Sequence, residues 1–455
     1  MKTEEGDSDN SMREEIKTVF LVSLGCARNQ VDSELMLGRL ADSGWTVVDD
    51  PEGAAAIVIN TCSFIESAAD ESIDAILEMS GYKKGGPCRK LVVAGCLPER
   101  YREEINAELP EVDAFLGTGA YDEILRVLEG PAEKGTCLLP DPDTITLQKP
   151  DSPRKLDADS AMAYLKIAEG CSRNCTYCII PRLRGRQKSR PMADIISEAG
   201  FLAAKGVKEV VLVAQDTTFY GRDISLEQGF AGLLDGLAGA CPDLWIRFLY
   251  GHPESIRPDV LAVVSRHPNI CSYFDIPIQH AGDRVLKRMG RNYTSGDLLR
   301  LFDEIRRKVP GAALRTTVIT GFPGETDEDF ESLEAFVRRV RFDHLGVFPY
   351  SDSEDLPSHR LPNPVPGQLA LERRARLMSV QLDISREINH RRLGMEVDVL
   401  VEENTEAGVF IGRTMFQAPE VDGLTILHAD NIEKGTRVRA RIEDTLEYDL
   451  IGKVL

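Results

Sequence analysis

Three short apolar runs near the amino terminus each end at a cysteine and lead into a helical pattern. The runs are VFLVSLGC, AAIVINTC and LVVAGC, which end at Cys26, Cys62 and Cys96. Continuous aliphatic and β-branched runs are typical of strands buried on both faces, and strands that alternate with helices form parallel β-α-β units. The carboxyl ends of such strands meet at one edge of the sheet, where ligands bind. We therefore expect the three cysteines to lie together, the alternative being three unrelated structural thiols.

The chain of 455 residues is long enough for several domains. Its first residues are polar and acidic and lack the apolar segment of a secretory signal. After the first α/β unit, a proline-rich stretch breaks the pattern. The composition and periodicity predict a disordered lead at 1–18, an N-terminal α/β domain at 19–130, a linker at 131–160, a central domain at 161–390 and a C-terminal domain at 391–455.

The central and C-terminal segments differ in their periodicity. Between 163 and 350, six strand-like runs alternate with helical stretches, which predicts six βα units that either close toward a barrel or form an open sheet. From 391 to 455 the strands are short and alternating, which is typical of a small antiparallel β-barrel. The predicted fold class is therefore α/β, with a parallel-sheet domain, a central partial (βα)6 barrel and a small β-barrel.

Composition excludes several classes of protein. The formal net charge of −20 argues against a general nucleic-acid-binding surface, which would be basic. No run of 18 apolar residues is present, so no membrane partner is expected. Ten cysteines in a chain of this length do not form a disulfide scaffold, and in a cytoplasmic protein clustered cysteines indicate metal ligands or catalysts. We expect a cytoplasmic location.

A second cysteine cluster follows the first strand of the central domain. The segment EGCSRNCTYCIIPRLRG places Cys171, Cys175 and Cys178 within eight residues. A structural zinc site usually takes four ligands in two separated pairs, whereas iron–sulfur clusters are held by cysteine thiolates, normally four. No fourth cysteine lies nearby. Three thiolates on a cubane would leave one iron open for a substrate or cofactor.

The spacing C-x3-C-x2-C, with Tyr177 before the last cysteine, resembles the signature of radical S-adenosylmethionine enzymes. The resemblance implies that the open iron chelates S-adenosylmethionine, and that an electron from the cluster releases a 5′-deoxyadenosyl radical, which the protein shields. It also suggests cofactor contacts at Tyr177, Gln215, Gln279 and Arg315, although the nearby Gly-Phe-Pro-Gly could equally be a simple turn.

The two halves together resemble the radical S-adenosylmethionine methylthiotransferase family along nearly the whole chain. The N-terminal motifs are GCARNQVDSE, NTCSFIESA and AGCLPERY. The resemblance implies that Cys26, Cys62 and Cys96 bind an auxiliary 4Fe–4S cluster, giving two clusters, and that the C-terminal barrel is a TRAM-like substrate-binding domain. It also implies two S-adenosylmethionine molecules: one methylates a sulfur at the auxiliary cluster, and the other yields the radical that abstracts hydrogen from the substrate carbon.

Within that family, the motifs SLGCARNQVDSE and GTGAYDEI resemble the RimO branch, which methylthiolates the β-carbon of an aspartate in small-subunit ribosomal protein twelve. The alternative is the branch that modifies adenosine in tRNA, against which the acidic C-terminal domain argues. Further alternatives are a second cluster used only for electron transfer and a non-enzymatic iron–sulfur protein. An electron donor and a sulfur source are required partners that the sequence does not identify.

Overall fold

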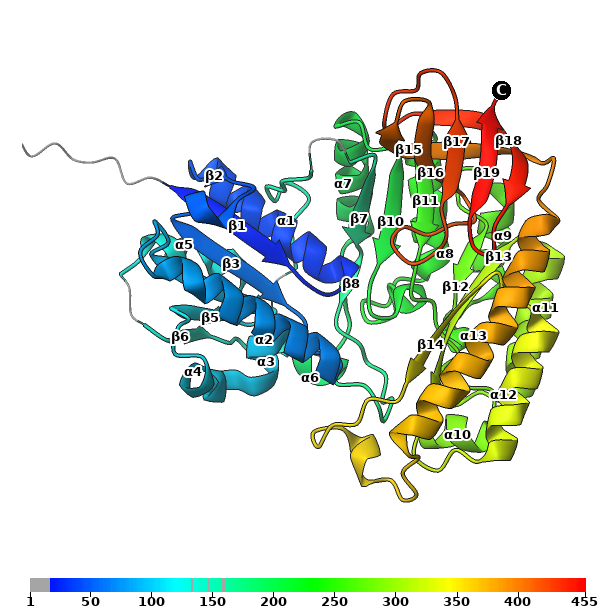
Figure 1. Cartoon of the computed structure of the whole chain (residues 1–455), viewed down its shortest axis with the longest axis horizontal. Helices are drawn as coiled ribbons and strands as arrows, with labels where there is room; N and C mark the ends of the chain where they lie inside the picture. Colours follow the sequence, from blue (N-terminus) through cyan, green and yellow to red (C-terminus); the bar gives the residue numbers. More distant parts are fainter. Residues whose placement is uncertain (1–16, 132–133, 146, 158–159) are drawn as a thin grey trace, which may run out of the picture.

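The computed structural model describes residues 17–131, 134–145, 147–157 and 160–455. Figure 1 shows three bodies along the chain: an N-terminal domain, a larger central domain and a small barrel formed by the last residues. The predicted disordered lead, residues 1–18, falls almost wholly outside the described residues, and so do positions 132–133, 146 and 158–159 of the predicted linker. None of the described helices has the length and apolar character needed to cross a bilayer.

The N-terminal domain is a parallel sheet in the order β2-β1-β3-β4-β5-β6. Its strands are β1 (Thr18–Ser23), β2 (Thr46–Val47), β3 (Ala56–Thr61), β4 (Lys90–Gly95), β5 (Ala114–Leu116) and β6 (Thr136–Leu138). Its helices are α1 (Ala27–Asp42), α2 (Glu66–Ser80), α3 (Cys96–Tyr101), α4 (Ile105–Glu108) and α5 (Ile124–Glu129). The predicted α/β domain with a parallel sheet is confirmed. β6 comes from the segment predicted as a linker and pairs with the edge strand β5.

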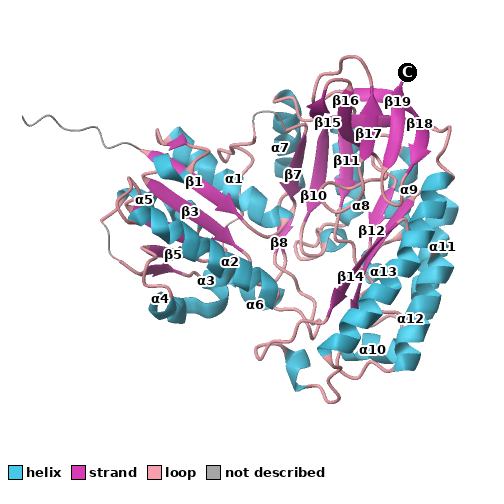
Figure 2. Cartoon of the chain, in the orientation of Figure 1, coloured by secondary structure: helices cyan, strands magenta, loops and turns pink. Residues whose placement is uncertain are grey.

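The central domain is an open, partial barrel of parallel strands with helices outside it (Figure 2). Its strands form two three-stranded sheets, β11-β10-β7 and β12-β13-β14, and a single bridge between Ile246 and Ile270 joins the first to the loop before β12. The strands are β7 (Met162–Lys166), β10 (Glu209–Val213), β11 (Trp245–Phe248), β12 (Tyr273–Asp275), β13 (Ala313–Thr320) and β14 (His344–Pro349); a short hairpin adds β8 (Ala168–Glu169) and β9 (Lys188–Ser189). The predicted partial (βα)6 barrel is confirmed.

The helices of the central domain cover the outside of its strands (Figure 2). They are α6 (Ile180–Arg184), α7 (Met192–Ala204), α8 (Gly229–Ala240), α9 (Pro258–Arg266), α10 (Asp283–Arg288), α11 (Ser295–Lys308), α12 (Asp327–Val340) and α13 (Gly367–His390). The two helices α11 and α12 begin with capping boxes, at Thr294 with Asp297 and at Thr326 with Asp329. One large apolar core lies between these helices and the strands.

The C-terminal domain is a closed barrel in the order β15-β16-β17-β19-β18. Its strands are β15 (Glu396–Glu406), β16 (Val409–Thr414), β17 (Thr425–His428), β18 (Arg437–Thr445) and β19 (Leu450–Val454). The predicted small barrel is confirmed, with one difference in detail: β17 pairs with β19 in parallel, while the other neighbouring pairs of the barrel are antiparallel. β17 and β19 are not consecutive in the chain. β18 lies between them in sequence and pairs with β19 in the antiparallel sense, so β19 returns beside β17 in the same direction.

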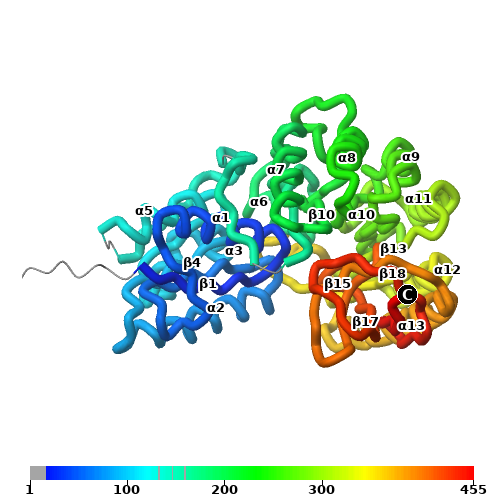
Figure 3. The backbone as a smooth tube through the Cα atoms, turned by 90° about the horizontal axis from the view of Figure 1, so that it is seen from above, coloured from blue at the N-terminus to red at the C-terminus, as the bar shows by residue number. Residues whose placement is uncertain are grey.

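The barrel docks on the amino ends of the central strands. Glu209, the first residue of β10, receives hydrogen bonds from Arg413 of the barrel (2.7 Å) and Arg247 of β11 (2.6 Å). Tyr273, the first residue of β12, donates to Asp422 of the barrel (2.6 Å). Seen from above, in Figure 3, the N-terminal domain and the barrel occupy separate positions around the central domain. The carboxyl ends of the central strands are therefore left free of the barrel.

Candidate iron–sulfur and cofactor site

The N-terminal cysteines follow three adjacent strands of one sheet. Cys26 precedes α1 after β1, Cys62 directly follows β3, and Cys96 is the first residue of α3 after β4. The strands β1, β3 and β4 are neighbours and run in parallel. The three thiols therefore come to one edge of the sheet because the strands that carry them all end there.

Two glycines permit the turns that bring these cysteines together. Gly25 and Gly95 immediately precede Cys26 and Cys96, and both have φ near +97°, a left-handed conformation that side chains disfavour. A Cβ on Gly25 would lie 2.8 Å from Cβ of Cys62 and 3.3 Å from its Sγ. The backbone before Cys26 thus passes directly beside the side chain of Cys62.

Two arginines give the N-terminal triad a positive environment. Burial alone would raise the pKa of the Cys26 thiol, but the guanidinium groups of Arg28 and Arg184 outweigh it and the pKa is lowered. Burial raises the pKa of Cys62, and it raises that of Cys96 to about 12 although Arg184 opposes the shift. The two arginines therefore favour the thiolate of Cys26 more than burial disfavours it, whereas burial favours the neutral thiols of Cys62 and Cys96.

The central cysteines lie on one loop between β8 and α6. Two backbone hydrogen bonds tie the loop to the central domain: the Cys171 amide donates to the carbonyl of Gly185 (2.9 Å) and the Thr176 amide to that of Met289 (3.1 Å). The amide of Arg173 also donates to Sγ of Cys171 (3.5 Å). Burial raises the pKa of Cys171 to about 11 and that of Cys178 to about 12. Burial therefore favours the neutral form of these two thiols as well.

Tyr177 anchors the same loop to the predicted cofactor turn. Its ring packs edge-on against Phe322, with centroids 6.3 Å apart, and Phe322 belongs to the Gly-Phe-Pro-Gly turn after β13. Its hydroxyl accepts a hydrogen bond from Nε of Arg291 (3.1 Å). Nη1 of Arg291 is buried and has no partner among the described residues, so it is available to a polar ligand.

The other three predicted cofactor residues lie at different depths of the partial barrel. Gln215 follows β10 and donates to Glu169 (2.7 Å), while its Oε1 is buried without a partner among the described residues. Gln279 follows β12 and holds a positive φ of 67°, a strained conformation that is common at functional sites. Arg315 lies near the amino end of β13 and ion-pairs with Asp275 (3.0 Å) and Asp422 of the barrel (3.4 Å). It faces the docked barrel more than the carboxyl ends of the strands.

Cysteine thiols are the donors that both triads offer to a metal. No group of three or more His, Cys, Asp or Glu side chains in the described parts of the chain is placed to hold one metal ion. A cubane offers a separate iron to each thiolate and accepts a wider spacing of ligands than one ion does. The two sets of three thiols, one of them beside Arg28 and Arg184, are the candidate ligands of anionic iron–sulfur clusters.

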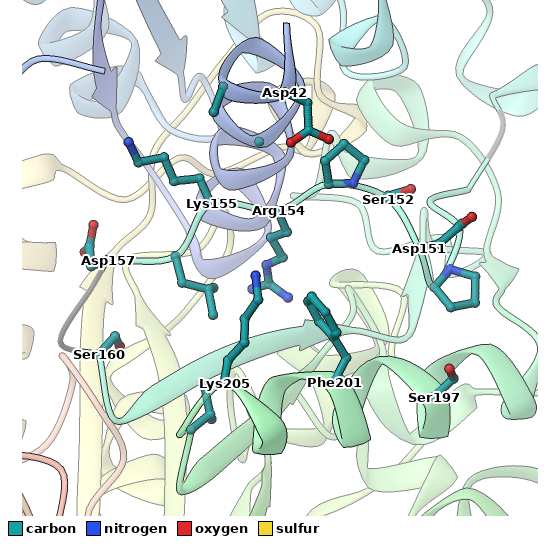
Figure 4. A pocket seen from close by; sticks show the side chains of 16 residues that line it. Asp42, Asp151, Ser152, Arg154, Lys155, Asp157, Ser160, Ser197, Phe201 and Lys205 are labelled. Carbon is teal, nitrogen blue, oxygen red and sulfur yellow. The ribbon is translucent and has the colours of Figure 1, made fainter. Parts of the chain in front are cut away.

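A cavity of about 340 Å³ lies beside Cys26 and is lined by Glu34, Asp157 and Glu420 of the barrel. The larger cavity, of about 760 Å³, touches neither triad. Figure 4 shows it as a crevice between α1 and α7, with Arg154 pointing toward Phe201 and Lys205. Arg154 is already satisfied by Glu34 and Glu198. Of these two cavities, the smaller is therefore the one that borders a candidate cluster ligand.

Several residues at these sites were not apparent from the sequence. Arg28 stacks on the ring of Tyr250 at 4.6 Å, and Arg184 and Asn29 are buried beside the N-terminal triad. Arginine and asparagine are mostly exposed in proteins, so the burial of Arg184 and Asn29 indicates a specific role. Burial can be seen only once the fold is known. Arg28 and Asn29 lie two and three residues after Cys26, and that proximity is the one sequence clue to their place.

Models of three known families match consecutive parts of the chain. The uncharacterized protein family UPF0004 matches residues 18–117, the radical SAM superfamily matches residues 165–337 and the TRAM domain matches residues 393–455. The first segment covers the parallel sheet without β6, the second covers the partial barrel without β14 and α13, and the third covers the closed barrel. The radical SAM match was expected from the cysteine spacing, and the TRAM match from the resemblance to the methylthiotransferase family.

Solved structures share the fold at low sequence identity. A radical S-adenosylmethionine methyltransferase, TsrM from Kitasatospora setae, solved with tryptophan and a SAM analogue, superposes with a TM-score of 0.55 at 16% identity over 81% of this chain and 89% of that one. The cobalamin-dependent radical enzyme OxsB gives a TM-score of 0.52 at 14% identity over 82% of this chain and 56% of its own. At this identity the likeness shows the fold alone.

Curated relatives match over almost their whole length. Proteins named ribosomal protein uS12 methylthiotransferase RimO are 53% identical in Desulfosudis oleivorans, 47% in Clostridioides difficile and 43% in Geobacter sulfurreducens. Each match covers 96% of this chain and 98–99% of the relative. With this identity along all three domains, the chain belongs to the RimO family of radical S-adenosylmethionine methylthiotransferases and is an enzyme.

Proposed function

We propose that this enzyme methylthiolates the β-carbon of an aspartate in ribosomal protein uS12. The observation that carries the proposal is the match over 96% of the chain to proteins named for that activity. A ribosomal substrate places the proposed reaction in the cytoplasm.

The proposed cofactors are two 4Fe–4S clusters and two molecules of S-adenosylmethionine. Cys171, Cys175 and Cys178 would hold one cluster, and Cys26, Cys62 and Cys96 the other. When bound, these groups supply the hydrogen-abstracting radical and the methylated sulfur. In the net reaction one hydrogen of the β-carbon leaves on 5′-deoxyadenosine and a methylthio group replaces it. The methyl would come from the second S-adenosylmethionine, which becomes S-adenosylhomocysteine, and the sulfur from a source at the sulfide level. An external donor would supply one electron when the first S-adenosylmethionine is split into methionine and the radical, and one electron would be released again when the methylthio group bonds to the carbon.

The chain's own residues would bind the cofactor and hold its surroundings in place. The unpartnered Oε1 of Gln215 and Nη1 of Arg291 are buried polar atoms of opposite character, an acceptor and a donor. Such atoms are costly to bury without a partner, so a polar ligand that reached either atom would satisfy it. Tyr177 orients Arg291 through its hydroxyl and is held in turn by Phe322. We propose Tyr177, Gln215 and Gln279 as cofactor contacts, with Arg315 deeper in the barrel.

The acidity of the C-terminal domain favours a protein substrate over tRNA. Residues 391–455 contain eight Lys and Arg against thirteen Asp and Glu, a net charge of −5. RNA binding draws much of its affinity from basic side chains that neutralise phosphates. Ribosomal proteins are basic as a class, so an acidic barrel offers complementary charge and a faster encounter.

A direct comparison of substrates tests the proposal. The anaerobically reconstituted enzyme is incubated with S-adenosylmethionine, a reductant and a sulfide source, together with either uS12 or unmodified tRNA. Mass spectrometry should find a methylthio group on a uS12 aspartate, and binding of uS12 should weaken as salt is added. A methylthio group on tRNA adenosine, with none on the protein, would show that the chain acts on the substrate of the other branch.

A further inference from the structure

Arg184 is a buried arginine that reaches from the central domain into the N-terminal triad. It is the last residue of α6, and its side chain is 1% exposed. Its Nη2 atom lies 3.8 Å from Sγ of Cys96 in hydrogen-bonding geometry. The sulfur belongs to the N-terminal sheet and the guanidinium to the domain that carries Cys171, Cys175 and Cys178. The contact therefore crosses the domain boundary at one of the proposed cluster ligands.

Asn29 binds the same Nη2 atom of Arg184 that approaches the Cys96 sulfur. Its Oδ1 accepts from Nη2 of Arg184 (2.6 Å) and lies 3.7 Å from Sγ of Cys26. Its Nδ2 donates to the carbonyl of Thr61 (2.8 Å), the residue before Cys62. Asn29 and Arg184 together thus contact two of the three cysteines directly and the third through its neighbouring peptide.

An internally balanced set of charges holds Arg184 in place. Its Nη1 donates to Glu169 (2.9 Å) and lies 3.4 Å from Asp32. Lys166 donates to both of these carboxylates. Two buried cations thus face two buried anions, so the guanidinium needs no bound cluster to remain where it is. Its hydrogen bond to sulfur is set before the metal arrives.

The same network leads on to the central site. Glu169, which accepts from Arg184, also accepts from Nε2 of Gln215 (2.7 Å). Gln215 follows β10 and is a proposed cofactor contact. A continuous path of hydrogen bonds therefore runs from Sγ of Cys96 through Arg184 and Glu169 to Gln215.

We propose that Arg184 is a positioning residue that retains and tunes the N-terminal cluster by donating a hydrogen bond to the Cys96 thiolate. The inference rests on the proposed N-terminal cluster and adds to it a residue from the other domain. Groups that hydrogen-bond to metal ligands typically contribute 10- to 100-fold to metal affinity, and hydrogen bonds to cluster sulfurs set reduction potentials. Removing this bond should loosen the cluster and make it harder to reduce.

The test uses the Cys171→Ala, Cys175→Ala, Cys178→Ala chain, in which only the N-terminal cluster can form. In that background we expect Arg184→Gln to raise the rate at which a chelator removes iron about 10- to 100-fold. The reduction potential should move to a more negative value. Arg184→Lys keeps the charge but loses the planar fork, so it should give a smaller change in the same direction. This second variant also serves if Arg184→Gln does not fold.

Arg190→Gln is the matched control. Arg190 is also 1% exposed, donates to the carbonyl of Lys166 (2.7 Å) and pairs with Glu198 (2.6 Å), but it has no sulfur partner in the part of the chain that the structure describes. It should lower stability without altering iron release or potential. Equal release from the Arg184 and Arg190 variants would overturn the inference and leave the N-terminal cluster standing. A background protein that holds no iron would overturn the N-terminal cluster and the inference with it.

Discussion

The two cysteine triads are built in opposite ways. Cys171, Cys175 and Cys178 lie on one loop. Local contacts, such as the hydrogen bond from the Cys171 amide to the carbonyl of Gly185, hold that loop in shape. Cys26, Cys62 and Cys96 come from three strands and meet only when the sheet has formed. The loop triad depends on a short stretch of chain, whereas the sheet triad depends on the N-terminal fold and on its contact with the central domain.

The difference indicates which site tolerates change. Strand pairing over long sequence separations is a cooperative, non-local interaction, so damage anywhere in the sheet can displace the thiols. A loop tied to its own domain can keep its geometry while a neighbouring domain is altered. Changes in the N-terminal domain should therefore affect one triad and spare the other.

Removing the sheet triad should have the largest effect. In the Cys26→Ala, Cys62→Ala, Cys96→Ala chain we expect methylthiolation of uS12 to fall below detection, because the proposed sulfur-carrying site is gone. Reductive cleavage of S-adenosylmethionine should continue, since the loop triad lies on another domain. Both products can be followed by mass spectrometry of one reaction mixture.

Cys88 and Cys137 provide the matched control for that experiment. Both are free thiols of the N-terminal domain outside either triad. Cys88→Ala, Cys137→Ala should retain methylthiolation at close to the wild-type level. Methylthiolated uS12 from the variant that lacks Cys26, Cys62 and Cys96 would instead mean that these cysteines do not hold the sulfur-carrying site.

Removing the loop triad should halve the iron. The reconstituted wild-type chain is expected to carry about eight irons, four per cubane, and Cys171→Ala, Cys175→Ala, Cys178→Ala about four. The variant should also lose S-adenosylmethionine cleavage completely. Iron and sulfide analysis checks the count, and an unchanged iron content would contradict the assignment of this loop.

The sequence predicts the loop triad from its spacing and the sheet triad from strands that each end at a cysteine, and the structure shows that the three strands of the sheet triad are neighbours. The sequence alone could not identify Arg184 or Asn29, because nothing in the segment PRLRG distinguishes a buried arginine from an exposed one. β5 and β6 were also missed, since each has only three residues and offers little periodicity. Arg315 illustrates the limit at the cofactor site: it lies near the amino end of β13, and its ion pair with Asp422 exists only because the barrel docks there.

Substitution of Gly95, the residue before Cys96, is a milder way to disturb the sheet triad without touching the loop triad. A Cβ at Gly95 would lie 2.6 Å from the carbonyl of Thr61, on a backbone already at φ +97°. We expect Gly95→Ala to destabilise the N-terminal domain by about 1–3 kcal/mol and to reduce iron at the sheet triad, with the loop cluster retained. Total iron should then lie between the wild-type and the four-iron values.

Gly44→Ala is the control that separates backbone strain from the steric clash expected at Gly95. Gly44 also has a left-handed backbone, at φ +84°, but no atom lies within 4 Å of an added Cβ. It should lower the thermal midpoint of the apoprotein slightly and leave the iron content unchanged. If both variants lose iron equally, general destabilisation rather than displacement of Cys96 is the cause.

The smallest effect should come from a buried ion pair remote from both triads, where the barrel docks. Burial would raise the pKa of Glu209, but Arg247 and Arg413 outweigh it and the pKa is lowered. A carboxyl with a depressed folded-state pKa stabilises the protein above its unfolded pKa of about 4.3, and that stabilisation is lost as the pH falls through the folded value. Glu209→Gln should therefore lower the thermal midpoint of the apoprotein at pH 7, and the difference from wild type should narrow toward pH 4. A loss of about 1–3 kcal/mol corresponds to a few degrees.

Asp398→Asn, at an exposed barrel ion pair with Arg439, should shift the midpoint far less. Neither variant should change the iron content, and a loss of iron in Glu209→Gln would show that barrel docking and the triads are coupled.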